Sequence, residues 1–300
     1  MHPFFDARQL TLGEAMQGID ETLLSQLEAG FKLPVKPAAL EQLQAELNRN
    51  DPSIDVVSEL IATDVAMSAT VLRVVNSPNF GKEKEITDIN YAVILLGLNT
   101  ISHIVSRYLL KQVFRQQGCC ISLARFWDTS TEISRLCVYI GQSLTRSLPA
   151  DNLQTLGLFH DIGIPVMAMN YPDYVNVLNE ANDNVHASLT QLEDKRYPCN
   201  HAILGFYMAH SWHLPKVLCN TVLRHHDLDF LDEHQSSEEE RLYYAILKVA
   251  ENIAHTHKRF RSINNWSSIE SQVLATLGWQ QNEYQARLEA GESLLIFNAN

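Results

Sequence analysis

The stretch Ile54–Val75, IDVVSELIATDVAMSATVLRVV, decides the fold class of this chain. Its apolar residues recur at steps of three and four, which places them on one face of a helix. Asp64 interrupts this pattern, so the stretch predicts two amphipathic helices that are divided near that residue. Asp51-Pro52-Ser53 precedes the first helix with a capping residue and with a proline suited to a first helical turn.

The same spacing continues through most of the chain, and alternating apolar runs typical of strands are absent. Further helices are expected over residues 88–96, 99–113, 125–144, 151–160, 200–212, 215–226 and 241–257. Gly97 is expected to interrupt the helices on either side of it, and Asp151 to cap the helix that ends at His160. Residues 227–240 carry seven acidic side chains and are expected to form a solvated loop. The sequence therefore predicts an all-α protein.

A polar seam at Gln116-Gln117-Gly118 divides the chain into residues 1–118 and 119–300. The sequence predicts an N-terminal helical segment and bundle in the first part, and a second bundle with a C-terminal helical extension in the other. Residues Lys258-Arg259-Phe260-Arg261 form the dense positive patch of the sequence. That patch is interpreted as cations near a helix end or on a solvated face.

The composition excludes several classes of protein. The chain has 300 residues, of which 46% are hydrophobic and 19% charged, as in folded soluble domains. Its net charge of -12 disfavours binding to nucleic acid or to anionic lipid, since both need a basic surface. The longest apolar stretch, Ala92–Leu98, is too short to span a bilayer. We therefore expect neither a nucleic-acid nor a membrane partner.

The N-terminus and the cysteines favour a cytoplasmic location. The first residues do not show the pattern of a secretory signal peptide, which is a charged region followed by an apolar region and a cleavage site. Export is therefore not expected. Five cysteines form no Cys-x-x-Cys pair, which indicates free thiols in a reducing compartment rather than a disulfide frame or a zinc knuckle.

Histidine is the residue type that points to chemistry. His160 and Asp161 are adjacent at the end of a predicted helix, where the negative end of the helix dipole favours a cation. His201, His225, His226 and Glu251 follow at other helix positions. Imidazole and carboxylate groups together suit divalent first-row metals, which can activate water for phosphoester hydrolysis. The alternative is that these histidines are hydrogen-bonded inside a helical core, without an ion.

Several motifs carry a family resemblance. In the C-terminal part they are Gly157-Leu158-Phe159-His160-Asp161-Ile162-Gly163, His201-Ala202-Ile203-Leu204-Gly205, Trp212-His213-Leu214-Pro215 and His225-His226. In the N-terminal part they include Leu33-Pro34, Asp51-Pro52-Ser53, residues 60–64, residues 72–77, Phe80-Gly81, residues 86–92 and Leu96-Gly97. This pattern resembles the HD superfamily of metal-dependent phosphohydrolases and, more narrowly, the HDOD family, the HD-related output domain of bacterial signalling proteins. The resemblance covers roughly residues 33–227 and implies an N-terminal helical bundle packed on an HD-like helical bundle.

The resemblance also implies a ligand set that this chain does not reproduce in full. Catalytic HD enzymes place a histidine on an earlier helix and an aspartate on a later one. Thr129 stands at the first of these positions and Glu251 at the second. A hydroxyl is a poor substitute for imidazole on a divalent transition metal, whereas glutamate is competent but one methylene longer. The Gly-Tyr-Pro motif that accompanies cyclic dinucleotide hydrolysis is also absent after His226.

These departures favour a catalytically silent signalling output or adaptor protein that acts by binding signalling proteins, a small molecule or a nucleotide. The rival function is a phosphohydrolase that acts on a nucleotide or phosphoester, with Asp161 as the residue on which turnover would depend. In either case, His160, Asp161, His201, His225, His226 and Glu251 are the candidate ligands of a divalent metal, iron or manganese. Gly157 is expected to permit a close contact between helices, so that Gly157→Leu would destabilise the fold.

Overall fold

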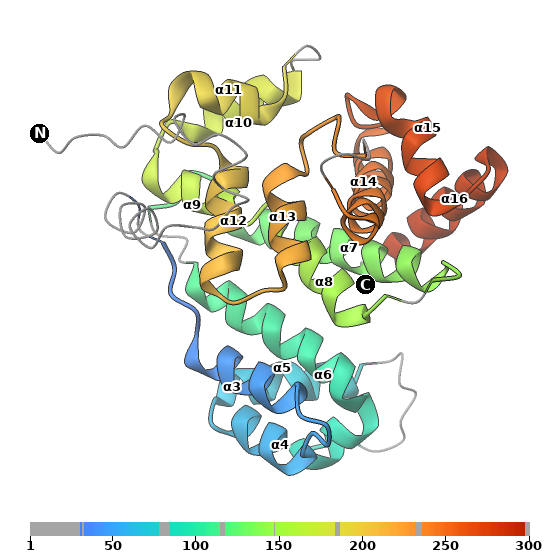
Figure 1. The fold of residues 1–300 in the computed structure, drawn as a ribbon. Helices are drawn as coiled ribbons and strands as arrows, with labels where there is room; N and C mark the ends of the chain where they lie inside the picture. Colours follow the sequence, from blue (N-terminus) through green and yellow to red (C-terminus); the bar gives the residue numbers. More distant parts are fainter. Residues whose placement is uncertain are drawn as a thin grey trace, which may run out of the picture. The chain divides into compact units, whose positions relative to one another are not determined.

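The computed structural model describes residues 31, 33–77, 85–114, 118–146, 148–183, 187–231 and 236–297. Within these ranges the regular elements are helices and no strand occurs, which confirms the predicted all-α class (Figure 1). The N-terminal segment before Phe31 and the Phe80-Gly81 motif lie outside the described residues. The chain divides into two compact units, Pro34–Arg115 and the part from Gln116 onward. The sequence-based boundary between residues 118 and 119 stays a prediction.

The helices of the first unit are α3 (Ala38–Leu47), α4 (Ile54–Ala62), α5 (Val65–Val75) and α6 (Ile89–Val113). Those of the second unit are α7 (Leu123–Gln142), α8 (Ala150–Phe159), α9 (Gly163–Asn170), α10 (Tyr174–Asp183), α11 (Leu189–Arg196), α12 (His201–Ser211), α13 (Lys216–Arg224), α14 (Glu238–Arg259), α15 (Trp266–Leu277) and α16 (Gln281–Phe297). The sequence analysis gave no individual bounds for α3, α9, α10, α11, α15 or α16, although it expected a helical N-terminal part and a C-terminal helical extension.

The first unit is built around the two amphipathic helices that the sequence predicts. α4 ends at Ala62 and α5 begins at Val65, with Asp64 as its N-cap. Their apolar faces are buried: Val57, Ile61 and Val71 have no exposed surface. Both helices pack against α6.

α6 is long and apolar enough by length and composition to cross a membrane. It lies against α3, α4 and α5, and Ile101 and Val105 are fully buried there. Gly97 has φ 77° and ψ 153°, so the helical geometry breaks at the residue where the sequence predicts an interruption. A kinked helix with one buried face is a core element of this unit, and the expectation that the chain has no membrane partner stays a prediction.

The N-cap of α5 supplies a first testable prediction. The Asp64 carboxylate accepts hydrogen bonds from the amides of Ala66 (2.8 Å) and Met67 (3.0 Å) and from the Tyr108 hydroxyl (3.0 Å). The Met67 bond is the largest cause that lowers the pKa of Asp64. Asp64→Ala is therefore expected to lower the free energy of unfolding by about 0.5–2 kcal/mol, measured by urea denaturation.

The pH dependence of that loss checks its cause. The pKa of Asp64 is lowered in the folded state. The Asp64 cap therefore contributes to the free energy of unfolding above the ordinary pKa of aspartate, and this contribution is lost as the pH falls below that pKa. The difference between wild type and Asp64→Ala should shrink from pH 6 toward pH 3. The exposed Asp51 supplies the control Asp51→Ala, and an equal loss in both variants would contradict the capping argument.

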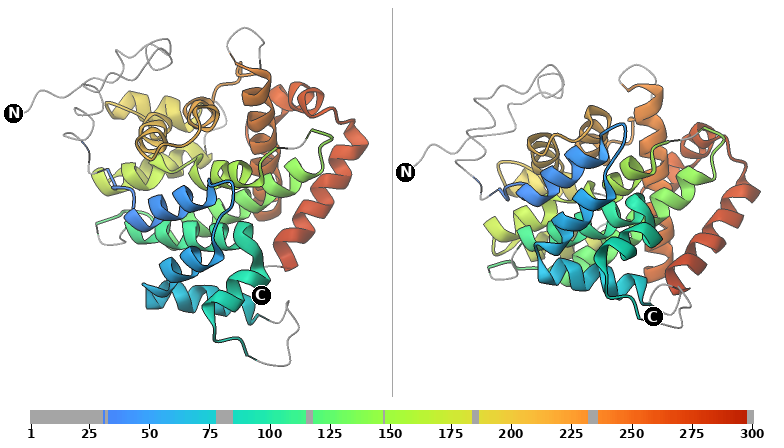
Figure 2. Two further views of the ribbon diagram at one scale, coloured as in Figure 1. Left: turned by 60° about the horizontal axis from the view of Figure 1, so that its bottom comes forward. Right: turned by 90° about the horizontal axis from the view of Figure 1, so that it is seen from below.

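In the second unit, α14 lies between α7 on one side and α15 and α16 on the other (Figures 1 and 2). α7 packs closely along α8, and a Cβ atom at Gly157 would stand 2.3 Å from Ser134 Cα and 2.5 Å from its amide nitrogen. The close helix contact predicted at Gly157 is present. α12 packs against α9 and α13. Asp161 lies just before α9, and His225 and His226 follow α13.

Three expectations about helix ends are corrected. The N-cap of α4 is Ser53, so Pro52 lies before the helix and not in its first turn. The N-cap of α8 is Pro149, and Asp151 lies inside the first turn, where its charge still favours the helix dipole. α14 begins at Glu238, with a capping box between Ser237 and Glu240. The end of the expected acidic loop is therefore helical, because acidic side chains stabilise a helix N-terminus. Asp232 and Glu233 lie outside the described residues.

Candidate metal centre

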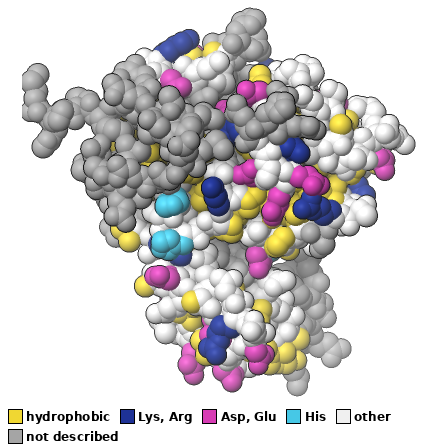
Figure 3. Space-filling model, in the orientation of Figure 1, with side chains coloured by type: hydrophobic (Ala, Val, Ile, Leu, Met, Phe, Trp, Pro, Cys, Tyr) yellow, Lys and Arg dark blue, Asp and Glu magenta, His cyan; other side chains and the backbone are white. Residues whose placement is uncertain are grey.

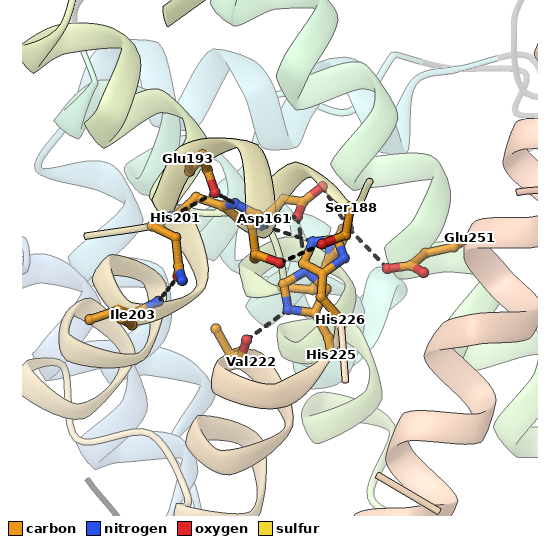
Figure 4. A network of polar contacts seen from close by, with 12 residues as sticks. Asp161, Ser188, Glu193, His201, Ile203, Val222, His225, His226 and Glu251 are labelled. Carbon is orange, nitrogen blue, oxygen red and sulfur yellow. Dashed lines mark hydrogen bonds and ion pairs between the residues drawn. The ribbon is translucent and has the colours of Figure 1, made fainter. Parts of the chain in front are cut away.

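Four of the candidate ligands converge from three helix ends. Asp161 follows α8, His201 begins α12, and His225 and His226 follow α13. One ligand atom from each of these four residues lies within 4.8 Å of the others. Figure 4 shows the Asp161 carboxylate between His201 and the adjacent pair His225 and His226.

A glycine explains why the helices can bring these residues together. A Cβ atom at Gly163 would stand 1.9 Å from the carbonyl oxygen of His201 and 3.0 Å from the amide nitrogen of Gly205. No other residue type fits there without moving the backbone of α12. The glycine two residues after Asp161 therefore sets the approach of α9 to α12, and with it the approach of Asp161 to His201.

Hydrogen bonds fix the orientation of the imidazole rings. His201 Nδ1 lies 2.6 Å from Glu193 Oε2, and His225 Nδ1 lies 2.7 Å from the carbonyl oxygen of Val222. Their Nε2 atoms consequently face Asp161 Oδ1, at 3.5 Å and 3.2 Å. His226 Nε2 lies 3.0 Å from His201 Nε2.

The cluster is an electrostatically coupled group. Burial alone raises the pKa of Asp161, but the His160 charge and the hydrogen bonds from His160, His201 and His225 hold it well below its usual range. Burial lowers the pKa of His201, but the charges of Glu193 and Asp161 and the hydrogen bonds to them together outweigh burial and raise it to about 10. Burial lowers the pKa of His226, and the His225, His201 and Lys248 charges lower it further. Asp161 is thus ionised and His226 neutral, which are the ligand states that metals require, whereas His201 is protonated near neutral pH and would have to release its Nε2 proton to bind an ion.

This donor set fits a divalent transition metal. Three imidazoles and one carboxylate match the ligand preference of such ions. Metal-bound histidines usually donate their second ring N–H to a carboxylate or a carbonyl group, and Glu193 and Val222 provide those partners here. Asp161, His201, His225 and His226 are therefore the residues that would hold an ion.

His160 and Glu251 stand at the edge of this group. His160 Nδ1 lies 2.9 Å from the carbonyl oxygen of Gly157, and its Nε2 atom lies 3.2 Å from Asp161 Oδ2. Glu251 Oε1 is 4.0 Å from His160 Nε2, and its other oxygen accepts a hydrogen bond from Lys248 Nζ at 2.7 Å. Figure 4 shows Glu251 on a separate helix, to the side of the four ligands. Metal ligation by His160 and Glu251 stays a prediction.

Thr129 also has a cationic partner. Lys258 Nζ donates a hydrogen bond to Thr129 Oγ1 at 2.8 Å. Thr129, Lys258, His160, Asp161 and Glu251 all line one cleft of about 750 Å³. The cleft opens directly beside the four ligands, because His226 lines it as well.

Sequence reasoning missed Glu193, whose side chain is fully buried on α11. It accepts hydrogen bonds from the Tyr174 hydroxyl and from His201. α11 has the polar sequence LTQLEDKR, which gives no local signal that one of its acids is buried. Lys248 was missed for the same reason, since its 2% exposure arises from tertiary packing.

Glu193 leads to a second prediction. Glu193→Gln removes the charge that faces His201 Nδ1, so the ring loses its carboxylate partner. The affinity for Mn²⁺, measured by calorimetry, is expected to fall by about 10–100-fold. Glu180→Gln breaks a surface pair with Arg196 and should leave the affinity unchanged. Equal Mn²⁺ affinities of wild type and Glu193→Gln would show that this carboxylate does not position His201.

The fold and the cluster together define an all-helical protein with an HD-type His/Asp site. The family model of the HDOD domain matches residues 33–228. The chain belongs to the HDOD family.

Relatives and solved structures agree with that assignment. An uncharacterised protein of Treponema pallidum (strain Nichols) is 26% identical over 202 residues, which are 67% of this chain and 39% of the relative. This chain therefore spans less than half the length of that relative. Among solved structures, an HDOD domain protein of unknown function from Geobacter sulfurreducens has a TM-score of 0.70 at 22% identity, covering 91% of this chain and 95% of its own. A candidate phosphohydrolase from Shewanella amazonensis SB2B has a TM-score of 0.66 at 22% identity, covering 91% and 96%.

A third structure, a candidate signal transduction protein from Marinobacter aquaeolei VT8, has a TM-score of 0.72 at 14% identity, covering 90% of this chain and 60% of its own. At these identities the similarity to solved structures shows a shared fold alone.

Proposed function

We propose that this protein is a catalytically silent HDOD output or adaptor protein of bacterial signalling, which acts in the cytoplasm by binding a small ligand and partner proteins. The observation that carries the proposal is that lysine ammonium groups engage the side chains at both departures from the catalytic HD ligand set. Lys258 bonds Thr129 and Lys248 bonds Glu251.

At Thr129 the chain offers no ligand for a transition metal. Its hydroxyl is a weak donor to such ions compared with imidazole. Lys258 Nζ, at 2.8 Å, occupies one hydrogen-bonding position of the hydroxyl and brings a positive charge to that side of the cleft. A cation that approached Thr129 would compete with this ammonium group, which also pairs with Glu132.

At Glu251 the carboxylate already has a cationic partner. Lys248 Nζ donates to it at 2.7 Å, and the Lys248 side chain is nearly fully buried, so little water screens the pair. Releasing Glu251 to a metal would leave the ammonium group of Lys248 unpaired in the interior. The remaining ligand set is Asp161, His201, His225 and His226.

A divalent ion held by those four residues would supply a fixed positive charge and Lewis acidity beside the cleft. Glu193 and the carbonyl group of Val222 orient two of the imidazoles toward it. Because the ligands come from the ends of α8, α12 and α13, such an ion would tie three helices together and stabilise the fold.

The test combines metal analysis with an activity screen of the full chain. We expect bound iron or manganese, or none, and no turnover of phosphodiester or nucleotide substrates above the rate of an Asp161→Ala control. Stoichiometric metal together with turnover that Asp161→Ala abolishes would overturn the proposal.

That outcome would support the second candidate function, a metal-dependent phosphohydrolase acting on a nucleotide or phosphoester. The observation in its favour is the four-ligand cluster at the edge of the 750 Å³ cleft, since a substrate bound there would lie next to Asp161. A gain of turnover in Thr129→His would identify the missing imidazole as the cause of the silence in the natural sequence.

A further inference from the structure

The cleft beside the metal ligands has a charge opposite to that of the whole protein. The chain carries a net charge of -12, and acidic side chains are spread over the face shown in Figure 3. The ionisable groups that line the cleft, apart from histidine, are two carboxylates, Asp161 and Glu251, and four cations. The cations are Lys248, Lys258, Arg259 and Arg261. A cationic cleft in an acidic protein concentrates anions.

Three of these cations belong to the positive patch that the sequence analysis interpreted as a solvated face or a helix end. α14 ends at Arg259, and Phe260 follows with φ 55°, in the left-handed region. This turn reverses the chain before α15, and Lys258, Arg259 and Arg261 all reach the cleft wall. The wall lies outside residues 33–228, the segment that matches the HDOD family.

Two of the cations are available to a ligand. The carboxylate of Glu251 pairs with Lys248, and Lys258 pairs with Glu132 and Thr129. Arg261 donates to the carbonyl oxygen of Asn182 at 3.1 Å, and its own carbonyl oxygen lies 2.7 Å from His255 Nδ1. These contacts hold Arg261 in place without neutralising its charge. Arg259 has no hydrogen-bond or ion-pair partner among the described residues.

The neighbouring start of α15 adds uncharged donors to the same wall. Its N-cap, Asn265, makes no side-chain capping bond, and Ser267 and Ser268 in the first turn line the cleft. The Ser268 hydroxyl and amide already donate to the carbonyl oxygen of Asn265, so Ser267 is the serine of this turn that can donate to an anionic oxygen. Another part of the lining is apolar and includes Ile164, Leu178 and Leu228.

We propose that the cleft binds a small phosphate-bearing molecule, with Arg259 and Arg261 holding the phosphate and the apolar side chains holding its body. The proposal rests on the proposed function and names the class of its ligand. The volume of 750 Å³ lies in the range of roughly 300–1,000 Å³ that small-molecule sites occupy. The guanidinium fork matches phosphate oxygens in pairs, which favours two arginines for this role.

The experiment is calorimetric titration of the full chain with ADP, with inorganic pyrophosphate and with adenosine, in EDTA and again with Mn²⁺. We expect ADP and pyrophosphate to bind and adenosine, which lacks phosphate, to bind at least about tenfold more weakly, equivalent to about 1.4 kcal/mol. Arg259→Gln/Arg261→Gln is expected to weaken ADP binding by about tenfold or more and to leave the melting temperature unchanged. Raising the salt concentration should weaken ADP binding to wild type more than to this variant.

The matched control is Arg125→Gln/Lys216→Gln, which removes the same charge from two exposed positions that do not line the cleft. ADP binding by this control should equal that of wild type. The proposal is overturned if neither ADP nor pyrophosphate binds at millimolar concentration, or if the two double variants bind ADP equally well.

The outcomes separate this proposal from the proposed function. Hydrolysis of bound ADP in Mn²⁺ would overturn catalytic silence while supporting the arginine site. Absence of anion binding together with absence of turnover would overturn the arginine site alone.

Discussion

Gly157→Leu is expected to lower the free energy of unfolding of the second unit by about 3 kcal/mol or more. Overpacking a core typically costs roughly 1–3 kcal/mol. The reason is that the new Cβ atom would meet backbone, at 2.3 Å from Ser134 Cα and 3.0 Å from the carbonyl carbon of Ile133. Side chains can change rotamer to relieve a clash, but here α7 and α8 must move apart. The measurement is the midpoint of urea or thermal unfolding, followed by far-UV circular dichroism.

A smaller substitution separates this clash from the extra volume of leucine. Gly157→Ala adds only the Cβ atom and should still lower the midpoint. In Gly291→Ala the new Cβ atom meets only side-chain atoms of Ile253 at 3.1 Å and Leu136 at 3.2 Å, which can shift. Gly291→Ala should therefore be the milder alanine variant. An unchanged melting temperature in Gly157→Leu would contradict the placement of α8 against α7.

Asp161→Asn is expected to have the largest effect on metal binding. It removes the carboxylate that faces three imidazoles and replaces it with a neutral amide of nearly the same shape. The Mn²⁺ affinity should fall by more than the 10–100-fold typical of losing an outer partner such as Glu193. Mn²⁺ at about 100 times its Kd should stabilise wild type by about 2.7 kcal/mol and should not stabilise the variant.

His210→Ala is the matched control, because His210 lies on α12 with His201 but is exposed at the other end of the helix. It should bind Mn²⁺ as wild type does. If Asp161→Asn keeps the wild-type Mn²⁺ affinity, or if wild type gains no stability from Mn²⁺, the four residues are a hydrogen-bonded core rather than a metal centre.

The sequence predicted the elements with strong local signals. The split at Asp64, the break at Gly97 and the close contact at Gly157 all depend on properties of one residue or of one helical face, and all three are present. α11 was missed because its sequence is polar on most sides and its position depends on a buried acid. α15 and α16 lie outside the segment on which the family motifs fall.

The candidate site was predictable to the extent that its motifs are local. His160-Asp161 and His225-His226 are adjacent pairs at helix ends, and the structure places Asp161, His201, His225 and His226 together. Their surroundings were not predictable in the same way. The contact of Lys258 with Thr129 spans 129 residues and depends on helix packing that no spacing rule encodes. Lys248 and Glu251 are three residues apart on α14, so their pairing follows helical spacing, but the burial of Lys248 depends on packing.

The origin of the cleft wall has a consequence for the evolution of recognition. Asp161 and its histidine partners lie within the segment shared across the family, whereas Arg259 and Arg261 lie beyond it. If Arg259 and Arg261 hold a phosphate as we propose, substitutions at the α14–α15 corner would change ligand affinity and leave Asp161 and its histidine partners in place.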